Sequence, residues 1–267
     1  MTVPALPWWE PETAGAMSPL LCHRRWWWHQ RPFPHVRAVN VFTPAVYAEL
    51  EDAFLGWLSS SGGGATLAAH DLRGTTVTSA FEGPLRLFAS RGWQALLARA
   101  LGVRVTQHVN LGLHHHEPGG LPGFAHNDLN PGWFPEVDAP SERVVLADPG
   151  VVDYTSGRPL SPEARPVRVV RAVAVLFYLA NPAWERTHRG ETGLYTRGGR
   201  DMSDPVASAA PHNNSLLVFE CTPWSFHGFR GGGSVGRNSV VAWLHRPEAD
   251  VVNRWGPDAV MGYGTGA

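Results

Sequence analysis

Two potential metal ligands, His126 and Asp128, lie two residues apart near the middle of the chain. On a β-strand, residues i and i+2 project from the same face, so a strand here would present the imidazole and the carboxylate side by side. One further histidine would complete two nitrogens and one oxygen on one face of a metal ion. That ligand set, with open positions opposite, is typical of non-haem Fe(II) oxygen chemistry.

Candidates for a third ligand and for a carboxylate receptor lie in the C-terminal half of the chain. His227 occurs in a strand-like segment, and Arg237 and Ser239 follow in the last such segment. An arginine holds a carboxylate through charge-assisted hydrogen bonds, and a serine on the same strand face can donate to that carboxylate. A His-x-Asp pair alone is a weak signal in a chain with 13 histidines, and its combination with these residues strengthens it.

The composition is that of a globular protein that buries a core. The 267 residues are 43% hydrophobic and carry a formal charge of −1, which gives no electrostatic support for binding nucleic acid or an anionic membrane. No apolar run reaches the length of about 18 residues that suggests a membrane span. Two cysteines and the lack of a signal-peptide pattern predict a cytoplasmic protein without a disulfide framework. All basic residues are arginines, which excludes a Schiff-base lysine.

The predicted elements are two helices followed by several short strands. Thr43-Pro44 is a typical helix start, and a second amphipathic pattern predicts a helix over 83–101. Strand patterns follow, chiefly over 103–116, 167–179, 215–219 and 237–244. This order predicts one mostly β domain, a sandwich or barrel with the helices packed on one side. Its parts are an N-terminal arm with helices (1–102), a β core (103–246) and a C-terminal tail (247–267).

Two segments lack a clear period. Residues 131–168 are Pro-rich and polar, and we expect a long loop with a short hairpin around 155–157. Insertions of this length often act as lids or binding loops, the alternative being a mobile decoration. For residues 1–30 the sequence predicts an irregular arm. Its clustered tryptophans favour core packing, but an aromatic flap or a contact in a homodimer stays open.

These motifs resemble those of the 2-oxoglutarate- and Fe(II)-dependent oxygenases, particularly the prolyl 4-hydroxylase-like branch, over about residues 105–245. The residues that carry the resemblance are His126-x-Asp128, His227 and Arg237-x-Ser239. The segment 174–181, Gly190-Glu191-Thr192 and His116-Glu117-Pro118-Gly119 add to it. The chain departs from the branch in having His116 where Tyr is common, and in its long insertion. The resemblance implies a double-stranded β-helix, or jelly-roll (cupin-like), core.

The resemblance also implies a site and a reaction. Fe(II) would be held by His126, Asp128 and His227, and the co-substrate 2-oxoglutarate by Arg237 and Ser239, with further contacts predicted from His116 and Asn110. With O2, such a site oxidises a substrate C–H bond and releases succinate and CO2. Related halogenases have Ala or Gly at the carboxylate position, so Asp128 predicts hydroxylation instead. Desaturation, epimerisation and ring closure use the same metal ligands, so these reactions stay open as alternatives.

The substrate is the least determined part of this prediction. Candidate substrate residues are His114, Trp133, Phe134, Arg197 and Trp224, each of which could equally have an ordinary structural role. We favour a small molecule, such as an amino acid or a natural-product intermediate, in a cavity closed by 131–168. An open groove beside His126 would favour a peptidyl or protein hydroxylase. A non-catalytic metal-binding jelly roll or a zinc hydrolase is a further alternative, but neither needs a fixed carboxylate receptor.

Overall fold

A computed structural model describes residues 7–22, 25–60, 65–67, 72–137 and 143–263. The strands of the large sheet are β1 (Trp26–His29), β2 (His35–Val39), β3 (Ala65–Leu67), β4 (Leu72–Thr76), β5 (His108–His116), β6 (Pro131–Pro135), β7 (Val145–Leu146), β8 (Pro166–Tyr178), β11 (Ser215–Glu220) and β13 (Arg237–Arg246). Their order is β1-β2-β11-β8-β13-β5-β4-β3, with β6 on β8 and β7 on β5. The small sheet, β10-β9-β12, contains β9 (Thr192–Leu194), β10 (Ala207–Ala209) and β12 (His227–Phe229).

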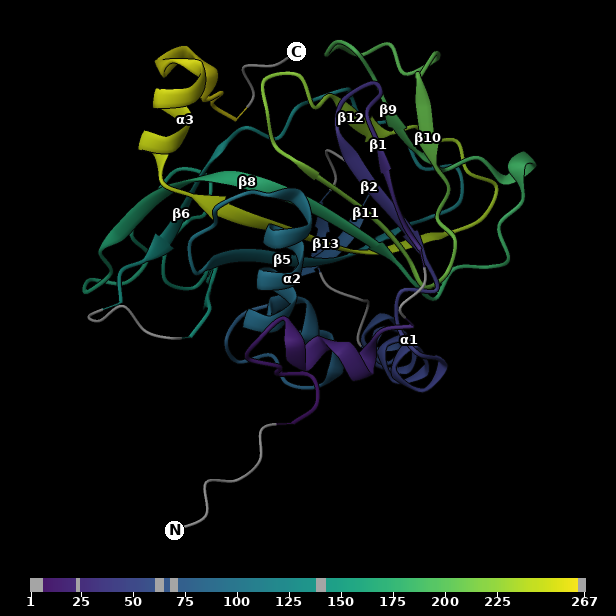
Figure 1. The fold of residues 1–267 in the computed structure, drawn as a ribbon, viewed down its shortest axis with the longest axis horizontal. Coiled ribbons are helices and arrows are strands. Elements are labelled where there is room, and N and C mark those ends of the chain that lie inside the picture. Colours follow the sequence, from purple (N-terminus) through teal and green to yellow (C-terminus); the bar gives the residue numbers. More distant parts are fainter. Residues whose placement is uncertain (1–6, 23–24, 61–64, 68–71, 138–142, 264–267) are drawn as a thin grey trace.

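Helices cover one face of the large sheet. Figure 1 shows α1 (Pro44–Ser59) and α2 (Arg91–Leu101) below this sheet, and β9, β10 and β12 on its other side. The remaining helical elements are η1 (Gly15–Leu20), η3 (Pro84–Ala89), η4 (Arg186–His188), α3 (Glu248–Trp255) and η5 (Pro257–Ala259). The predicted mostly β fold with helices on one side is therefore confirmed. None of the helices in the described ranges combines the length and apolar character that crossing a lipid bilayer requires.

Local sequence signals explain the helix boundaries. The Thr43 side chain accepts a hydrogen bond from the Val46 backbone N–H at 3.4 Å, and Pro44 occupies the first turn of α1. The single helix predicted over 83–101 is wrong. Ser90 is extended (ψ 151°), and its hydroxyl accepts from the Trp93 backbone N–H at 3.2 Å, so a new helix starts there and the residues before it form the 3₁₀ helix η3.

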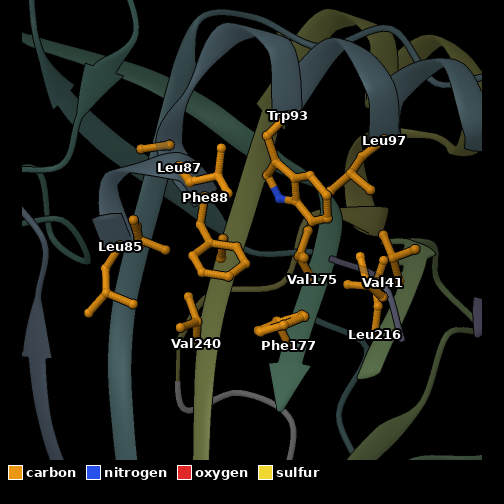
Figure 2. Packing of buried hydrophobic residues seen from close by; sticks show 14 of the residues in the cluster. Val41, Leu85, Leu87, Phe88, Trp93, Leu97, Val175, Phe177, Leu216 and Val240 are labelled. Carbon is orange, nitrogen blue, oxygen red and sulfur yellow. The ribbon is translucent and has the colours of Figure 1, made fainter. Parts of the chain in front are cut away.

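Alternation along the central strands separates two apolar cores. On β8, Val175 and Phe177 face the helices, and Figure 2 shows both side chains in the layer beneath Trp93 and Leu97 of α2. Leu176 and Tyr178 of β8 face the other way and pack with Leu217 and Phe219 of β11 and Leu194 of β9, between the two sheets. The face between the sheets is the one that carries the candidate site.

Three predictions about irregular segments need correction. Part of the insertion 131–168 belongs to the large sheet, because β6 pairs with β8 from Pro131↔Val170 to Pro135↔Pro166. The tail predicted at 247–267 contains α3, whose Val251 is fully buried in the core between the sheets. The N-terminal arm contributes β1, which pairs with β2 at the sheet edge. In each case tertiary pairing gives order to a segment without a strong local period.

Leu97→Ala tests the helix-facing core. Leu97 is fully buried, and removing its side chain should lower the free energy of unfolding by about 2–5 kcal/mol in chemical denaturation. Leu55→Ala is the matched control, since Leu55 lies on α1 with 45% of its surface exposed and should change stability by less than about 1 kcal/mol. Equal losses in the two variants would contradict the packing described here.

Candidate metal and co-substrate site

The two candidate histidine ligands face each other across an antiparallel bridge. His126 and His227 exchange both backbone hydrogen bonds, at 3.0 and 2.8 Å. Directly opposed residues of this kind project their side chains to the same face, and the two ring centroids lie 4.6 Å apart. The pairing of these two segments therefore brings together two imidazoles that are far apart in the sequence.

Asp128 joins the histidines from a turn, which corrects the prediction that it shares a strand with His126. Asp128 has φ 59°, a left-handed conformation that Asp and Asn adopt more readily than most residues. The Asn127 side-chain oxygen accepts from the Leu129 backbone N–H at 3.1 Å, and the Ser225 hydroxyl donates to the Asn127 carbonyl at 3.1 Å. These two bonds hold the turn against the segment that leads into β12.

The three side chains converge as a metal site requires. Asp128 Oδ2 lies 3.2 Å from His227 Nε2, and Asp128 Oδ1 lies 3.7 Å from His126 Nε2. One ligand atom from each residue falls within 4.8 Å of the others. Asp128 and His227 are buried, whereas 38% of the His126 side chain is exposed, so the cluster is approachable at the His126 edge.

Hydrogen bonds fix which imidazole nitrogen faces the cluster. Nδ1 of His126 contacts the Phe124 carbonyl at 2.9 Å, and Nδ1 of His227 contacts the Ser225 carbonyl at 3.0 Å. A carbonyl can only accept, so each Nδ1 carries the proton and each Nε2 keeps its lone pair for a metal. Burial lowers the pKa of His126 to about 4, which keeps its Nε2 unprotonated at neutral pH.

Two donors, the buried Arg171 and the half-buried Trp243, hold the Asp128 carboxylate. Nη1 of Arg171 donates to Oδ1, and the Trp243 indole N–H donates to Oδ2 at 2.8 Å. Burial by itself would raise the pKa of Asp128, but the Arg171 guanidinium together with His126 and His227 outweighs it and keeps this pKa well below its usual range. Each carboxylate oxygen accepts one of these bonds and keeps lone-pair capacity for a cation.

A second group of polar side chains on the same sheet face includes buried donors that an anion would satisfy. Arg237 is 5% exposed, its Nη2 donates to the Thr192 hydroxyl at 2.9 Å, and its guanidinium lies over the rings of Tyr178 and Phe229. Nε of Arg237 and the hydroxyl of the fully buried Ser239 have no hydrogen-bond partner within the described residues. Buried donors without partners are costly, and a bound carboxylate would satisfy both.

The central strands connect these two groups. Ser239 pairs with Tyr178 at one end of the β13–β8 ladder, and His245 pairs with Arg171 at the other. β12 links the groups as well, because Phe229, beside Arg237, lies two residues after the ligand His227. Two residues along a strand span about 7 Å. A small dicarboxylate is long enough to bridge such a distance, from the three candidate metal ligands to Arg237 and Ser239.

The remaining predicted co-substrate and substrate residues occupy different positions. His116 stacks on Phe229 with ring centroids 4.1 Å apart, next to Arg237 in the register of β5 and β13. His114 pairs with Ser239 on the same strands, and Asn110 pairs with Trp243, at the Asp128 end. Their predicted contacts with co-substrate or substrate stay predictions. Arg197 and Trp224 are exposed, the latter at 62%.

Two further substrate candidates lie on β6. Phe134 is fully buried and packs edge-on against Tyr154 and His245, so it has no surface to offer a substrate. Trp133 points the opposite way on β6, where Arg168 lies over its ring at 5.8 Å. Sheet pairing of the insertion explains both positions, because it turns a presumed loop into alternating inward and outward residues.

The sequence interpretation missed four residues that contact the site: Tyr178, Thr192, Arg171 and Trp243. Trp243 could have been found, because it lies on the same alternating face of the last strand as Arg237 and Ser239. Arg171 could not. The register of β13 with β8 passes from Leu244↔Val173 to His245↔Arg171, so Ala172 is an extra residue that turns Arg171 to the face of the site.

Comparisons with known proteins bear on the fold. No protein-family model and no curated protein sequence matches the chain. Similar solved structures include a Pseudomonas putida prolyl-4-hydroxylase, with 12% identity, 79% of this chain and 92% of that chain covered, and a TM-score of 0.50. Another is a Trichoplax adhaerens prolyl hydroxylase, solved in complex with a hypoxia inducible factor oxygen degradation domain peptide fragment. It has 14% identity, 82% of this chain and 86% of that chain covered, and a TM-score of 0.53. The predicted jelly-roll core is thereby confirmed: the chain has the fold of the prolyl 4-hydroxylase-like oxygenases.

Proposed function

We propose that this protein is an Fe(II)- and 2-oxoglutarate-dependent dioxygenase of the hydroxylase type. The observation that carries the proposal is one sheet face that holds both a two-histidine, one-carboxylate cluster and, beside it, the buried donors of Arg237 and Ser239 without partners. Two histidines and a carboxylate with open positions suit Fe(II). A zinc hydrolase or a passive metal site has no use for the second group.

In this proposal the residues of the chain divide the work between them. His126, Asp128 and His227 would hold Fe(II), which when bound supplies the redox chemistry that couples decarboxylation of 2-oxoglutarate to oxidation of a substrate C–H bond. Arg237 and Ser239 would bind the distal carboxylate of the co-substrate, and Thr192 orients the guanidinium. Asp128 would supply the carboxylate ligand in whose absence a halide could bind, so hydroxylation remains the favoured outcome.

The substrate is proposed in two forms. A small molecule, such as an amino acid or a natural-product intermediate, is the first. A prolyl residue in a peptide is the second, and the position of the insertion favours it. The described parts of the insertion, 131–137 and 143–168, pack against β8 and His245, while the His126 edge is exposed. These described parts therefore do not form the closed cavity on which the small-molecule prediction rested.

An anaerobic titration with Fe(II) and 2-oxoglutarate tests the reaction class. The wild-type protein should develop the weak metal-to-ligand charge-transfer band of the chelated co-substrate. Asp128→Asn should lower metal affinity at least about 100-fold, because even an outer partner of a ligand is typically worth 10- to 100-fold. Asp204→Asn, a change at an exposed carboxylate, should leave the band unchanged. A folded wild-type protein that gives no band would refute the proposal.

Arg237→Gln tests the carboxylate receptor. Hydrogen bonds to charged groups contribute about 1.5–3 kcal/mol, so the affinity for 2-oxoglutarate should fall about 10- to 100-fold while the affinity for the metal alone stays nearly constant. Ser239→Ala should give a smaller loss of the same kind. Arg99→Gln, at an exposed position of α2, serves as the control. Parallel losses of metal and co-substrate affinity in Arg237→Gln would instead indicate a disturbed fold.

Succinate release distinguishes the two substrate classes. A peptidyl hydroxylase should release succinate faster with a proline-rich peptide than with free proline at equal proline concentration, because the peptide also contacts the surface around His126. A small-molecule enzyme that accepts proline should show the reverse order. Peptide mass and amino-acid analysis would locate the added oxygen. Stimulation by neither compound would exclude prolyl substrates of both kinds.

A further inference from the structure

A cage of three aromatic rings encloses Arg171 behind the metal cluster. Its guanidinium carbon lies 3.8 Å from the ring centroid of Trp243, 5.6 Å from that of Tyr154 and 5.5 Å from that of Tyr263. All three distances are within the range of cation–π attraction, and Arg171 is only 7% exposed. The rings come from β13, from the insertion and from the C-terminal segment, so three distant parts of the chain meet at one cation.

A chain of hydrogen bonds orients the caged guanidinium. The Nδ1 of His245 donates to the His108 carbonyl at 3.0 Å, which leaves its Nε2 as an acceptor for the Tyr154 hydroxyl at 2.8 Å. The Tyr154 oxygen then accepts from Arg171 Nε at 3.1 Å. The far side of the guanidinium donates to Asp128. His245, at the start of this chain of hydrogen bonds, is fully buried.

The C-terminal segment closes the cage. The Tyr263 hydroxyl donates to the Pro131 carbonyl at 2.7 Å, where β6 begins, and Asn130 donates to the Met261 carbonyl at 2.8 Å. The Met261 backbone N–H in turn donates to the Leu129 carbonyl at 3.1 Å. These bonds fasten the residues just after Asp128 to the segment that carries Tyr263. The turn and the cage are therefore one structural unit.

We infer that Arg171 is the positioning residue for the carboxylate ligand Asp128, and that the insertion and the C-terminal segment serve to assemble the cage that aims it. This inference rests on the proposed function. The planar guanidinium and the Trp243 indole each take one carboxylate oxygen, which sets the rotation of the carboxylate as well as its place. The insertion thus supports the proposed metal centre through Tyr154 and Arg171.

Arg171→Lys separates orientation from charge. A lysine keeps the positive charge but lacks the planar fork and the stacking on Trp243. Affinity for Co(II), titrated without co-substrate and followed by the visible absorption of the bound ion, should fall about 10- to 100-fold, as for other partners of metal ligands. The shape of the Co(II) spectrum should change as well, because the carboxylate loses its fixed rotation. Tyr154→Phe, which removes only the relay hydroxyl, should shift both readouts in the same direction and by less.

Two matched controls guard against a general loss of stability. Arg86→Lys alters another arginine with a carboxylate partner, Glu10 at 2.9 Å, and Tyr47→Phe removes another hydroxyl with two hydrogen-bond partners. Both should leave Co(II) affinity within about twofold of wild type. A folded Arg171→Lys protein with wild-type affinity and spectrum would overturn the inference, as would the same losses in both controls. The proposed function fails separately, if wild-type protein binds Co(II) normally but forms no complex with 2-oxoglutarate.

Discussion

A buried carboxylate that must stay charged is the constraint on which the site depends. Asp128 is 3% exposed, and removing an ionised carboxylate from water is costly unless it is paired and hydrogen-bonded. Arg171 and Trp243 meet that cost without any metal, so the carboxylate keeps its position and its charge in the protein alone. A cation that binds later meets ligands that are already ionised and aimed, and little reorganisation is left to oppose binding.

The same constraint explains why the site lies over β8 and β13. These strands are in the middle of the large sheet, between β11 and β5, and residues there are held by ladders on both sides. One end of the pair carries Arg171 and Trp243, and the other carries Tyr178 and Ser239. Within the described residues, Arg171 has a carboxylate partner whereas Arg237 forms no ion pair. At one end of this face the Arg171 charge is paired with Asp128, and a cation can bind there. At the other end the Arg237 charge has no carboxylate partner within the described residues, and an anion can bind there.

The sequence predicted what depends on period and local chemistry. Alternation predicted the central strands, and the Thr43-Pro44 cap predicted the start of α1. The pattern that includes Arg237 also identified His126, Asp128 and His227, whose side chains converge. The sequence did not reveal the features that depend on contacts between distant segments or on a single residue. The start of α2 depended on one capping serine, and β6 exists because β8 pairs with it. Arg171 was hidden by a bulge, because a regular strand would direct residues 171 and 174 to opposite faces. No periodic pattern can reveal an inserted residue whose effect is set by the neighbouring strand.

The position of the insertion changes where specificity should be sought. The described parts of the insertion, 131–137 and 143–168, include Tyr154, which bonds Arg171 behind Asp128, and the open side of the cluster is the exposed edge of His126. Next to His126, Ala125 forms a bridge with Gly199, which lies two residues after the exposed Arg197. Substrate contacts on loops that border a rigid metal centre can change in sequence without disturbing the ligands. The long insertion is different, because a change there would move Tyr154, then Arg171, and through it the carboxylate that we propose as a metal ligand.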